Sequence, residues 1–147
     1  MIGGLIAGTL DITYACVFSY IRSERTPMFV FRSVAGGALG PEQARAGGIK
    51  TAILGLAFHF LIALIWATVY FLASRVIPLM VDHAIVSGLA YGLCVFFFMY
   101  GVVLRFSAIH LTIWPWNLPR SVFIGGMLIH MFGIGLPIAL VARRYSK

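Results

Sequence analysis

Three ionisable side chains, Asp11, His59 and His130, lie within long apolar stretches of this sequence. Asp11 is the one acid or base in residues 2–21, and the stretches around the two histidines contain no Asp, Glu, Lys or Arg. A charged residue at the centre of a bilayer costs at least about 2.5–3.5 kcal/mol, so such residues usually belong to a proton path, a ligand site or a partner. Tyr14 follows Asp11 by three residues and therefore shares its helical face.

This set of residues is consistent with several kinds of chemistry. If it is functional, we expect a proton or small-solute pathway, because Asp and His are the usual members of intramembrane relays. Two histidines on facing helices could instead be the axial pair of a b-type haem, with Asp11 orienting one imidazole. Direct metal binding by Asp11, His59 and His130 would follow the two-histidine, one-carboxylate pattern. The remaining alternative is structural: neutral groups that hydrogen-bond across helices, worth about 0.6 kcal/mol on average.

A catalytic role has weaker support in the sequence. No serine or cysteine nucleophile is paired with a base at a useful spacing, so we assign no catalytic residue and favour a protein that is not an enzyme. The two cysteines, Cys16 and Cys94, both lie inside apolar stretches. They are therefore interpreted as free, packing thiols and not as a disulfide.

The composition is typical of a helical membrane protein. Its 147 residues are 61% hydrophobic and only 10% charged, whereas soluble domains carry roughly 25% charged residues. Runs of about 20 apolar residues predict spanning helices, since barrel strands need only about 9–11 residues. We therefore predict an all-α polytopic membrane protein in which residues 1–147 form one integral domain, a four-transmembrane-helix bundle. The predicted spans are 2–21, 51–73, 84–104 and 121–142.

Helix geometry places the three ionisable residues at a similar depth. With a rise of about 1.5 Å per residue, they fall within a slab on the order of 5 Å thick near the middle of their spans. Glycines share their helical faces, and a Gly-x-x-x-His spacing occurs twice. Small residues let helices approach closely in lipid, so we expect the polar side chains to point into the bundle. The glycines predicted to allow this packing are Gly4, Gly8, Gly55, Gly126 and Gly133.

Two further segments carry local signals. Thr26 as a cap and Pro27 in the first turn predict a short apolar helix over residues 27–39, which the following Gly-Pro pair ends. We expect this helix to lie in the membrane interface or to form a re-entrant segment. In the last span, Gly133 and Pro137 are expected to loosen the helix.

The positive charge indicates how the chain contacts a membrane. The net charge is +7, and of 11 basic residues seven lie in the first and third loops and four on the opposite side. The positive-inside rule therefore places these two loops in the cytoplasm and both termini outside. We interpret the charge as contact with anionic lipid and expect no nucleic-acid partner, because no soluble basic face is present. Four short helices leave little room for a cavity, so we expect a homo-oligomer or a larger membrane complex.

Four blocks of the sequence resemble small, uncharacterised bacterial inner-membrane proteins with four predicted spans. These proteins are related at a distance to a domain-of-unknown-function family. The resemblance implies a multi-pass protein of the bacterial inner (plasma) membrane, and implies no activity or cofactor. Asp11, His59 and His130 fall inside the shared blocks or the Gly-x-x-x-His tail motif. The blocks are AGTLDITYA (7–15), VAGGALG (34–40), GGIKTAILGLAFHFLIAL (47–64) and SGLAYGLCVFFFMYGVVL (87–104).

Overall fold

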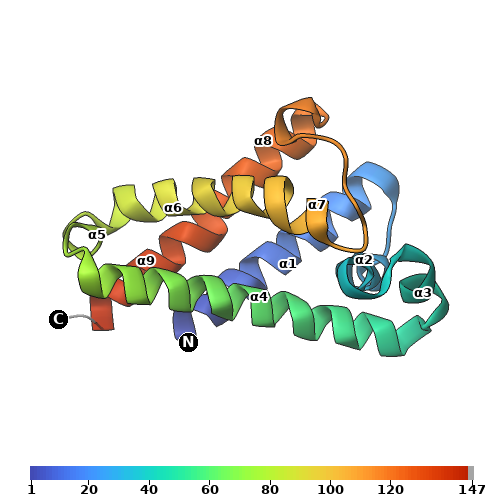
Figure 1. Ribbon diagram of the computed structural model, residues 1–147, viewed down its shortest axis with the longest axis horizontal. Coiled ribbons are helices and arrows are strands. Elements are labelled where there is room, and N and C mark those ends of the chain that lie inside the picture. The colour runs from blue at the N-terminus through green and yellow to red at the C-terminus, as the bar shows by residue number, and fades with distance from the viewer. Residues whose placement is uncertain (146–147) are drawn as a thin grey trace.

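All regular secondary structure that the computed structural model describes, in residues 1–145, is helical, which confirms the all-α part of the predicted fold class. The chain runs through long helices joined by short helical turns (Figure 1). The elements are α1 (Ile2–Ser23), α2 (Pro27–Leu39), α3 (Pro41–Ala46), α4 (Gly48–Val76), α5 (Leu79–Asp82), α6 (Ala84–Phe98), η1 (Met99–Val103), α7 (Leu104–Phe106), η2 (Pro115–Asn117), α8 (Arg120–Leu128), η3 (Ile129–Gly135) and α9 (Leu136–Tyr145).

Four helical stretches are long and apolar enough to cross a membrane. The first two are α1 and α4, and the others are continuous runs of several elements, α6–η1–α7 and α8–η3–α9. Each predicted span lies inside one of these stretches, because an uninterrupted apolar run both favours a helix and sets its length. A shorter apolar helix, α2, occupies the segment predicted between the first two spans.

The boundaries around α2 follow from local chemistry. Glu24 ends α1 in a left-handed conformation with φ of 52°. Pro27 begins α2, where a missing N–H costs nothing, and Gly40 ends it with φ of 86°, a value that glycine adopts without strain. Thr26 stands at the N-cap as predicted, but its side chain makes no capping hydrogen bond. Its carbonyl oxygen instead accepts a bond from the N–H of Phe29 at 2.9 Å.

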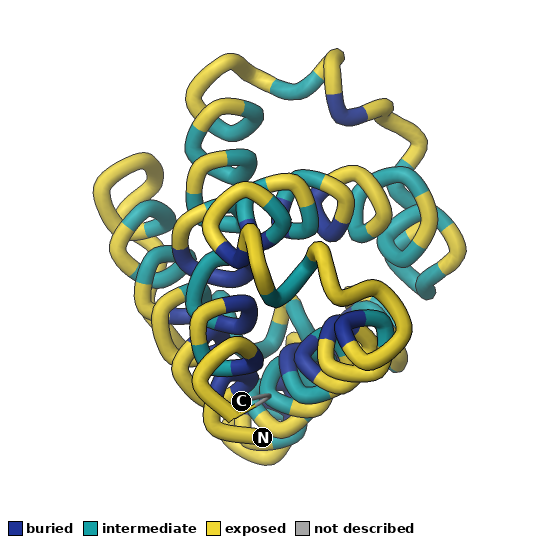
Figure 2. Tube along the Cα trace, turned by 90° about the vertical axis from the view of Figure 1, so that its left-hand side faces the viewer, coloured by how far each residue is buried: buried dark blue, intermediate teal, exposed yellow. Residues whose placement is uncertain are grey.

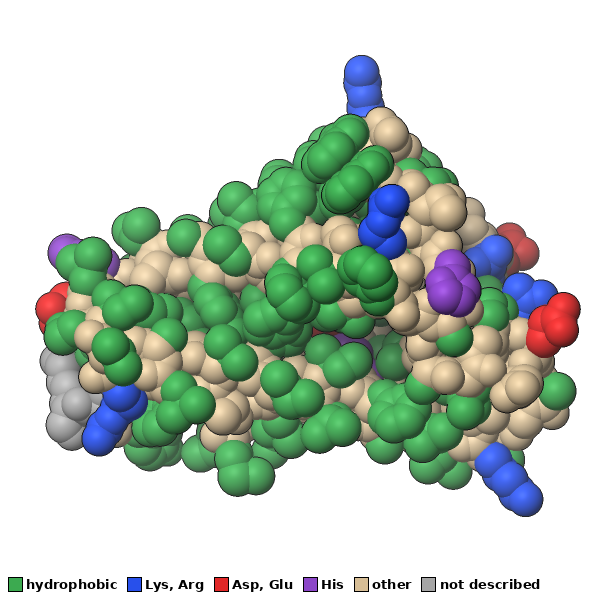
Figure 3. All heavy atoms as spheres, viewed as in Figure 1, with side chains coloured by type: hydrophobic (Ala, Val, Ile, Leu, Met, Phe, Trp, Pro, Cys, Tyr) green, Lys and Arg blue, Asp and Glu red, His purple; other side chains and the backbone are tan. Residues whose placement is uncertain are grey.

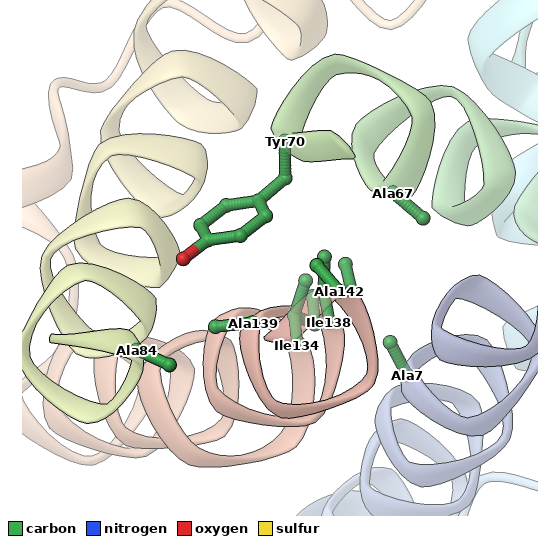
Figure 4. Close-up of a cluster of buried hydrophobic side chains, with 8 residues drawn as sticks. All are labelled: Ala7, Ala67, Tyr70, Ala84, Ile134, Ile138, Ala139 and Ala142. Carbon is green, nitrogen blue, oxygen red and sulfur yellow. The ribbon is translucent and has the colours of Figure 1, made fainter. Parts of the chain in front are cut away.

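The long helices lie side by side, with both termini at one end and α2 and α3 at the other (Figure 1). Helix α4 packs on α1 and α2, while α6 packs on η3 and α9. Buried residues face the middle of the bundle and exposed ones its outside (Figure 2). The main cluster of buried side chains joins α1, α4, α6, η3 and α9 near the termini (Figures 1 and 4). Its members are Ala7, Ala67, Tyr70, Ala84, Ile134, Ile138, Ala139 and Ala142.

Glycines bring the helix backbones close together. A Cβ atom on Gly4 would lie 3.1 Å from the Ala63 carbonyl oxygen of α4, and one on Gly8 would lie 2.9 Å from the Phe60 ring. Between α6 and η3 the approach is closer still, because a Cβ on Gly92 would collide with the backbone of His130. In lipid, such contacts replace the hydrophobic effect as the force that associates helices.

Two stretches depart from α-helical geometry, and one of them contains His130. The third spanning stretch widens to a π-helix at Met99–Val103, and the last one does so at Ile129–Gly135. Pro137 follows the second π segment and lacks the N–H that an α-helix would need there. The loosening expected near Gly133 thus takes the form of a π-helical turn, a feature often found at functional sites.

Candidate functional site

The structure brings Asp11 and His59 together across the contact between α1 and α4. The Nε2 atom of His59 lies 3.9 Å from Oδ2 of Asp11, and the two side chains are 13% and 20% exposed, respectively. This is the one acid–base pair within 4.0 Å in the part of the chain that the structure describes. The centre of the site is thus an acid and a base that lie close to each other and are both mostly buried.

A backbone carbonyl fixes the orientation of the His59 ring. Nε2 lies 2.9 Å from the carbonyl oxygen of Gly8, and since a carbonyl can only accept, Nε2–H is the donor. In the neutral imidazole, Nδ1 then carries the lone pair that can take a proton. His59 is therefore held in one tautomer, next to a carboxylate that can stabilise the doubly protonated ring.

Apolar side chains and small residues surround the pair. The Phe60 ring meets His59 edge-on, with 5.6 Å between centroids, and lies against Gly8 on the other helix. Figure 3 shows acidic and histidine atoms at the bottom of a hollow between apolar side chains. The side chains of His59 and Asp11 are only 13% and 20% exposed, so the bundle encloses most of the site.

His130 is hydrogen-bonded within its own helix and packs against α6. Its Nδ1–H donates to the carbonyl oxygen of Gly126, one turn earlier, at 2.8 Å. Its ring meets the edge of the buried Phe96 ring, with centroids 5.5 Å apart. No hydrogen bond or ion pair among the described residues joins His130 to Asp11 or His59.

Tyr14 makes its contacts with Phe18 of its own helix and with α8. Its ring stacks on Phe18 with 5.5 Å between centroids, and its hydroxyl group fills the space that a side chain at Gly125 would need. The structure shows no hydrogen bond between the described side chains of Tyr14 and Asp11. Tyr14 thus connects α1 with α8, and the compact part of the predicted site is the Asp11–His59 pair.

The predicted packing glycines separate into different contacts. Gly4 and Gly8 face α4, as described above, whereas Gly55 faces the backbone of α2 at Phe31. A Cβ on Gly126 would lie 3.0 Å from the Phe96 ring, and the nearest atoms to Gly133 belong to Ile129 of its own helix. The two Gly-x-x-x-His motifs therefore have different surroundings, with α2 beside the first and α6 beside the second.

The geometry gives little support to a metal or haem at these residues. Within residues 1–145 no group of three His, Cys, Asp or Glu side chains is placed to hold a metal ion. A haem ligated through Nε2 of His59 would have to break the bond to Gly8. What His59 can do while its bond to Gly8 stays intact is take up and release a proton at Nδ1, with the Asp11 carboxylate nearby.

An aromatic layer separates the Asp11–His59 pair from the end of the bundle that carries the termini. Tyr91 of α6 donates its hydroxyl to the carbonyl oxygen of Trp66 of α4 at 2.6 Å, and its ring lies 5.0 Å from that of Tyr70. Tyr70 is fully buried and donates to the carbonyl oxygen of Met80 at 3.0 Å. Beyond these aromatic residues lies the buried cluster of alanine and isoleucine side chains (Figure 4).

No protein-family model, curated protein or solved structure matches this chain. The site therefore has to be interpreted from its own geometry. The sequence identified Asp11 and His59 but gave no indication of the Gly8 carbonyl, because any residue can supply a backbone acceptor. The aromatic layer of Trp66, Tyr70 and Tyr91 was also missed, since its members come from helices distant in sequence.

Proposed function

We propose that this chain is an integral membrane protein in which His59, lying beside Asp11, takes up and releases a proton within the bilayer, as part of a proton or proton-coupled solute pathway. The observation that carries the proposal is the 3.9 Å separation of His59 Nε2 and Asp11 Oδ2 inside an apolar bundle. Ionisable pairs at such positions are usually found in proton relays and transport sites, because they are costly to bury without a purpose.

The outer surface supports the membrane setting of the proposal. Large apolar side chains are exposed along all the long helices, for example Leu5, Leu61, Leu72 and Phe98. In Figure 3 the charged side chains gather toward the ends of the molecule and on the projecting loop, and the middle of the face is apolar. A soluble protein rarely exposes apolar patches of this extent, whereas a lipid-facing surface requires them.

The hydrogen bond from His59 supports a specific proton step. With Nε2–H held by Gly8, a proton arriving at Nδ1 would create an imidazolium ion beside the Asp11 carboxylate. Loss of that proton from Nδ1 would restore the neutral tautomer, with Nε2–H still bonded to Gly8. The aromatic layer toward the termini would prevent an open channel, so passage to that side would require a conformational change.

The proposed location is the inner membrane of a bacterium, with the first and third loops in the cytoplasm and both termini outside. Its support is the resemblance of the sequence blocks and the excess of basic residues in those loops. Alkaline phosphatase fused to the C-terminus should be active in this orientation, and a fluorescent protein fused there should stay dark. A homo-oligomer or a larger membrane complex is proposed as the working form.

The test is proton flux into liposomes that contain the purified protein and a trapped pH-sensitive dye. With a potassium gradient and valinomycin, wild-type protein should acidify or alkalinise the lumen faster than protein-free liposomes. Asp11→Asn and His59→Gln should reduce the rate to that of protein-free liposomes. The matched controls Asp82→Asn and His83→Gln change the same residue types outside the site and should retain the wild-type rate.

The bond between His59 and Gly8 also favours a second candidate, a purely structural pair. In that case wild-type protein would transport no protons, and Asp11→Asn and His59→Gln would lower only the thermal stability in detergent. Equal flux through wild-type and protein-free liposomes, over a range of driving forces and with added candidate solutes, would contradict the proton pathway.

A further inference from the structure

A cavity lies between α2 and α3, at the end of the molecule opposite the termini (Figure 1). Its volume is about 250 Å³. Gly40 reverses the chain between the two helices, and the loop after α7 closes one side because the N–H of Ala108 donates to the Gly37 carbonyl oxygen at 2.9 Å. The cavity is lined by Phe29, Arg32, Ser33, Gly36, Pro41, Arg45 and Ile109.

Two arginines share this cavity without a negative partner. The Nη1 atom of Arg32 donates to the carbonyl oxygen of Arg45 at 3.3 Å, which holds the first guanidinium group against the second residue. The Nε atom of Arg32 is buried and has no hydrogen-bond partner among the described residues. No carboxylate lines the cavity, and in residues 1–145 neither arginine forms a salt bridge. Burying a hydrogen-bond donor of a charged group without an acceptor costs free energy, so the cavity lacks an acceptor for the Arg32 Nε–H.

The geometry assigns to this cavity the binding of a phosphate anion, carried either by a lipid headgroup or by free phosphate. Guanidinium groups match the oxygens of a phosphate in paired hydrogen bonds, and Arg32 has an unused Nε–H to contribute. Phe29 and Ile109 add apolar walls beside the arginines, which suits the junction of a headgroup with its acyl chains. This inference is independent of the Asp11–His59 pair, which lies in a different part of the bundle.

The test measures the thermal melting of the detergent-purified protein with three ligands: dioctanoyl phosphatidylglycerol, dioctanoylglycerol and inorganic phosphate. The phosphate-bearing lipid should raise the melting temperature in a saturable manner, and dioctanoylglycerol should not. If the lipid saturates at a concentration at least about tenfold lower than inorganic phosphate, the source is a lipid headgroup. If the two saturate alike and compete, the site accepts free phosphate. If neither ligand stabilises the protein, the proposal is wrong.

Variants connect the binding to the cavity. Arg32→Gln and Arg45→Gln should each weaken the apparent affinity about tenfold or more, as expected for the loss of a charged hydrogen bond. Arg22→Gln removes an arginine from the last turn of α1, outside the cavity, and should leave the affinity unchanged. Equal affinity in wild type and in both cavity variants would overturn the assignment.

A second type of variant keeps the test valid if the glutamine variants fold poorly. Ser33 is exposed at the rim of the cavity, and its hydroxyl donates only to the Phe29 carbonyl oxygen of its own helix at 2.8 Å. Ser33→Asp would place a carboxylate beside the two arginines and supply the missing negative charge. The variant should fold at least as stably as wild type and should lose stabilisation by the lipid and by phosphate. Undiminished binding in Ser33→Asp would contradict the proposal.

Discussion

The side chain of His59 is tied to the backbone of Gly8 on the neighbouring helix, with 2.9 Å between Nε2 and the carbonyl oxygen. This bond depends on the absence of a side chain at Gly8, where α1 and α4 approach each other closely. The same glycine lies one helical turn before Asp11, so one short segment of α1 supplies both the fixed acceptor and the carboxylate. Packing and chemistry at the site are therefore coupled.

Replacing Gly8 should therefore weaken the packing of α1 on α4 and also impair the function of the Asp11–His59 pair. A Cβ atom at this position would lie 2.9 and 3.0 Å from two atoms of the Phe60 ring, so Gly8→Val must separate the helices or displace that ring. We expect a loss of about 1–3 kcal/mol in stability, measured as a lower melting temperature in detergent, together with a loss of proton flux. Gly37→Ala is the control, because the nearest atom to its Cβ would be 3.9 Å away. A Gly8→Val variant as stable as wild type would show that α1 and α4 are not packed as described.

The contact between α6 and the π-helical segment η3 should tolerate an added side chain even less than the contact between α1 and α4. A Cβ on Gly92 would overlap the carbonyl group of His130, and backbone atoms cannot move aside as a flexible side chain can. Gly92→Ala should therefore cost at least as much as Gly8→Val, about 1–3 kcal/mol or more, in the same melting assay. Gly101→Ala, also on the third spanning stretch, has no other atom closer than 4.0 Å and should be close to neutral. Equal stability of the two alanine variants would argue against the close approach of α6 and η3.

The buried hydroxyl group of Tyr70 provides a test of the aromatic layer. It donates to the Met80 carbonyl oxygen at 3.0 Å and lies 2.8 Å from the Ser87 hydroxyl, which connects α4 to the turn before α6. Tyr70→Phe keeps the ring and removes this connection, so we expect a loss of about 0.6–1.7 kcal/mol in the detergent melt. Tyr20→Phe alters a tyrosine that is 63% exposed and should have no measurable effect. If the two variants melt alike, the hydroxyl of Tyr70 does not connect these elements.

The spans could be predicted from sequence because hydropathy and length alone determine them, and each lies inside a helix of the structure. The similar positions of Asp11 and His59 along their helices could also be estimated from the sequence, and the structure places the two side chains 3.9 Å apart. The direction of a side chain around the helix was harder to predict. His130 lies in a π-helical turn and bonds to its own backbone, and no residue pattern specifies where such a turn begins. The cavity between Arg32 and Arg45 depends on a chain reversal at Gly40 and was equally invisible.

The exposure of Cys94 offers a direct test of the membrane setting. Its side chain is exposed on α6, between residues that would face lipid, whereas a soluble protein would present it to water. In a Cys16→Ala background, a membrane-impermeant maleimide should leave Cys94 unlabelled in permeabilised membranes, because a polar reagent does not enter the hydrocarbon that would surround this thiol. Labelling should become complete in SDS.

The control for this labelling experiment is Ser23→Cys in a background without the native cysteines, since Ser23 is exposed at the end of α1. This thiol should react readily in the same membranes and thereby prove that the reagent reaches the protein. If Cys94 reacts as fast as the thiol at position 23, the outer face of α6 is in contact with water. That face would then line an aqueous space or a polar interface, and the four-helix bundle would not be surrounded by lipid as proposed.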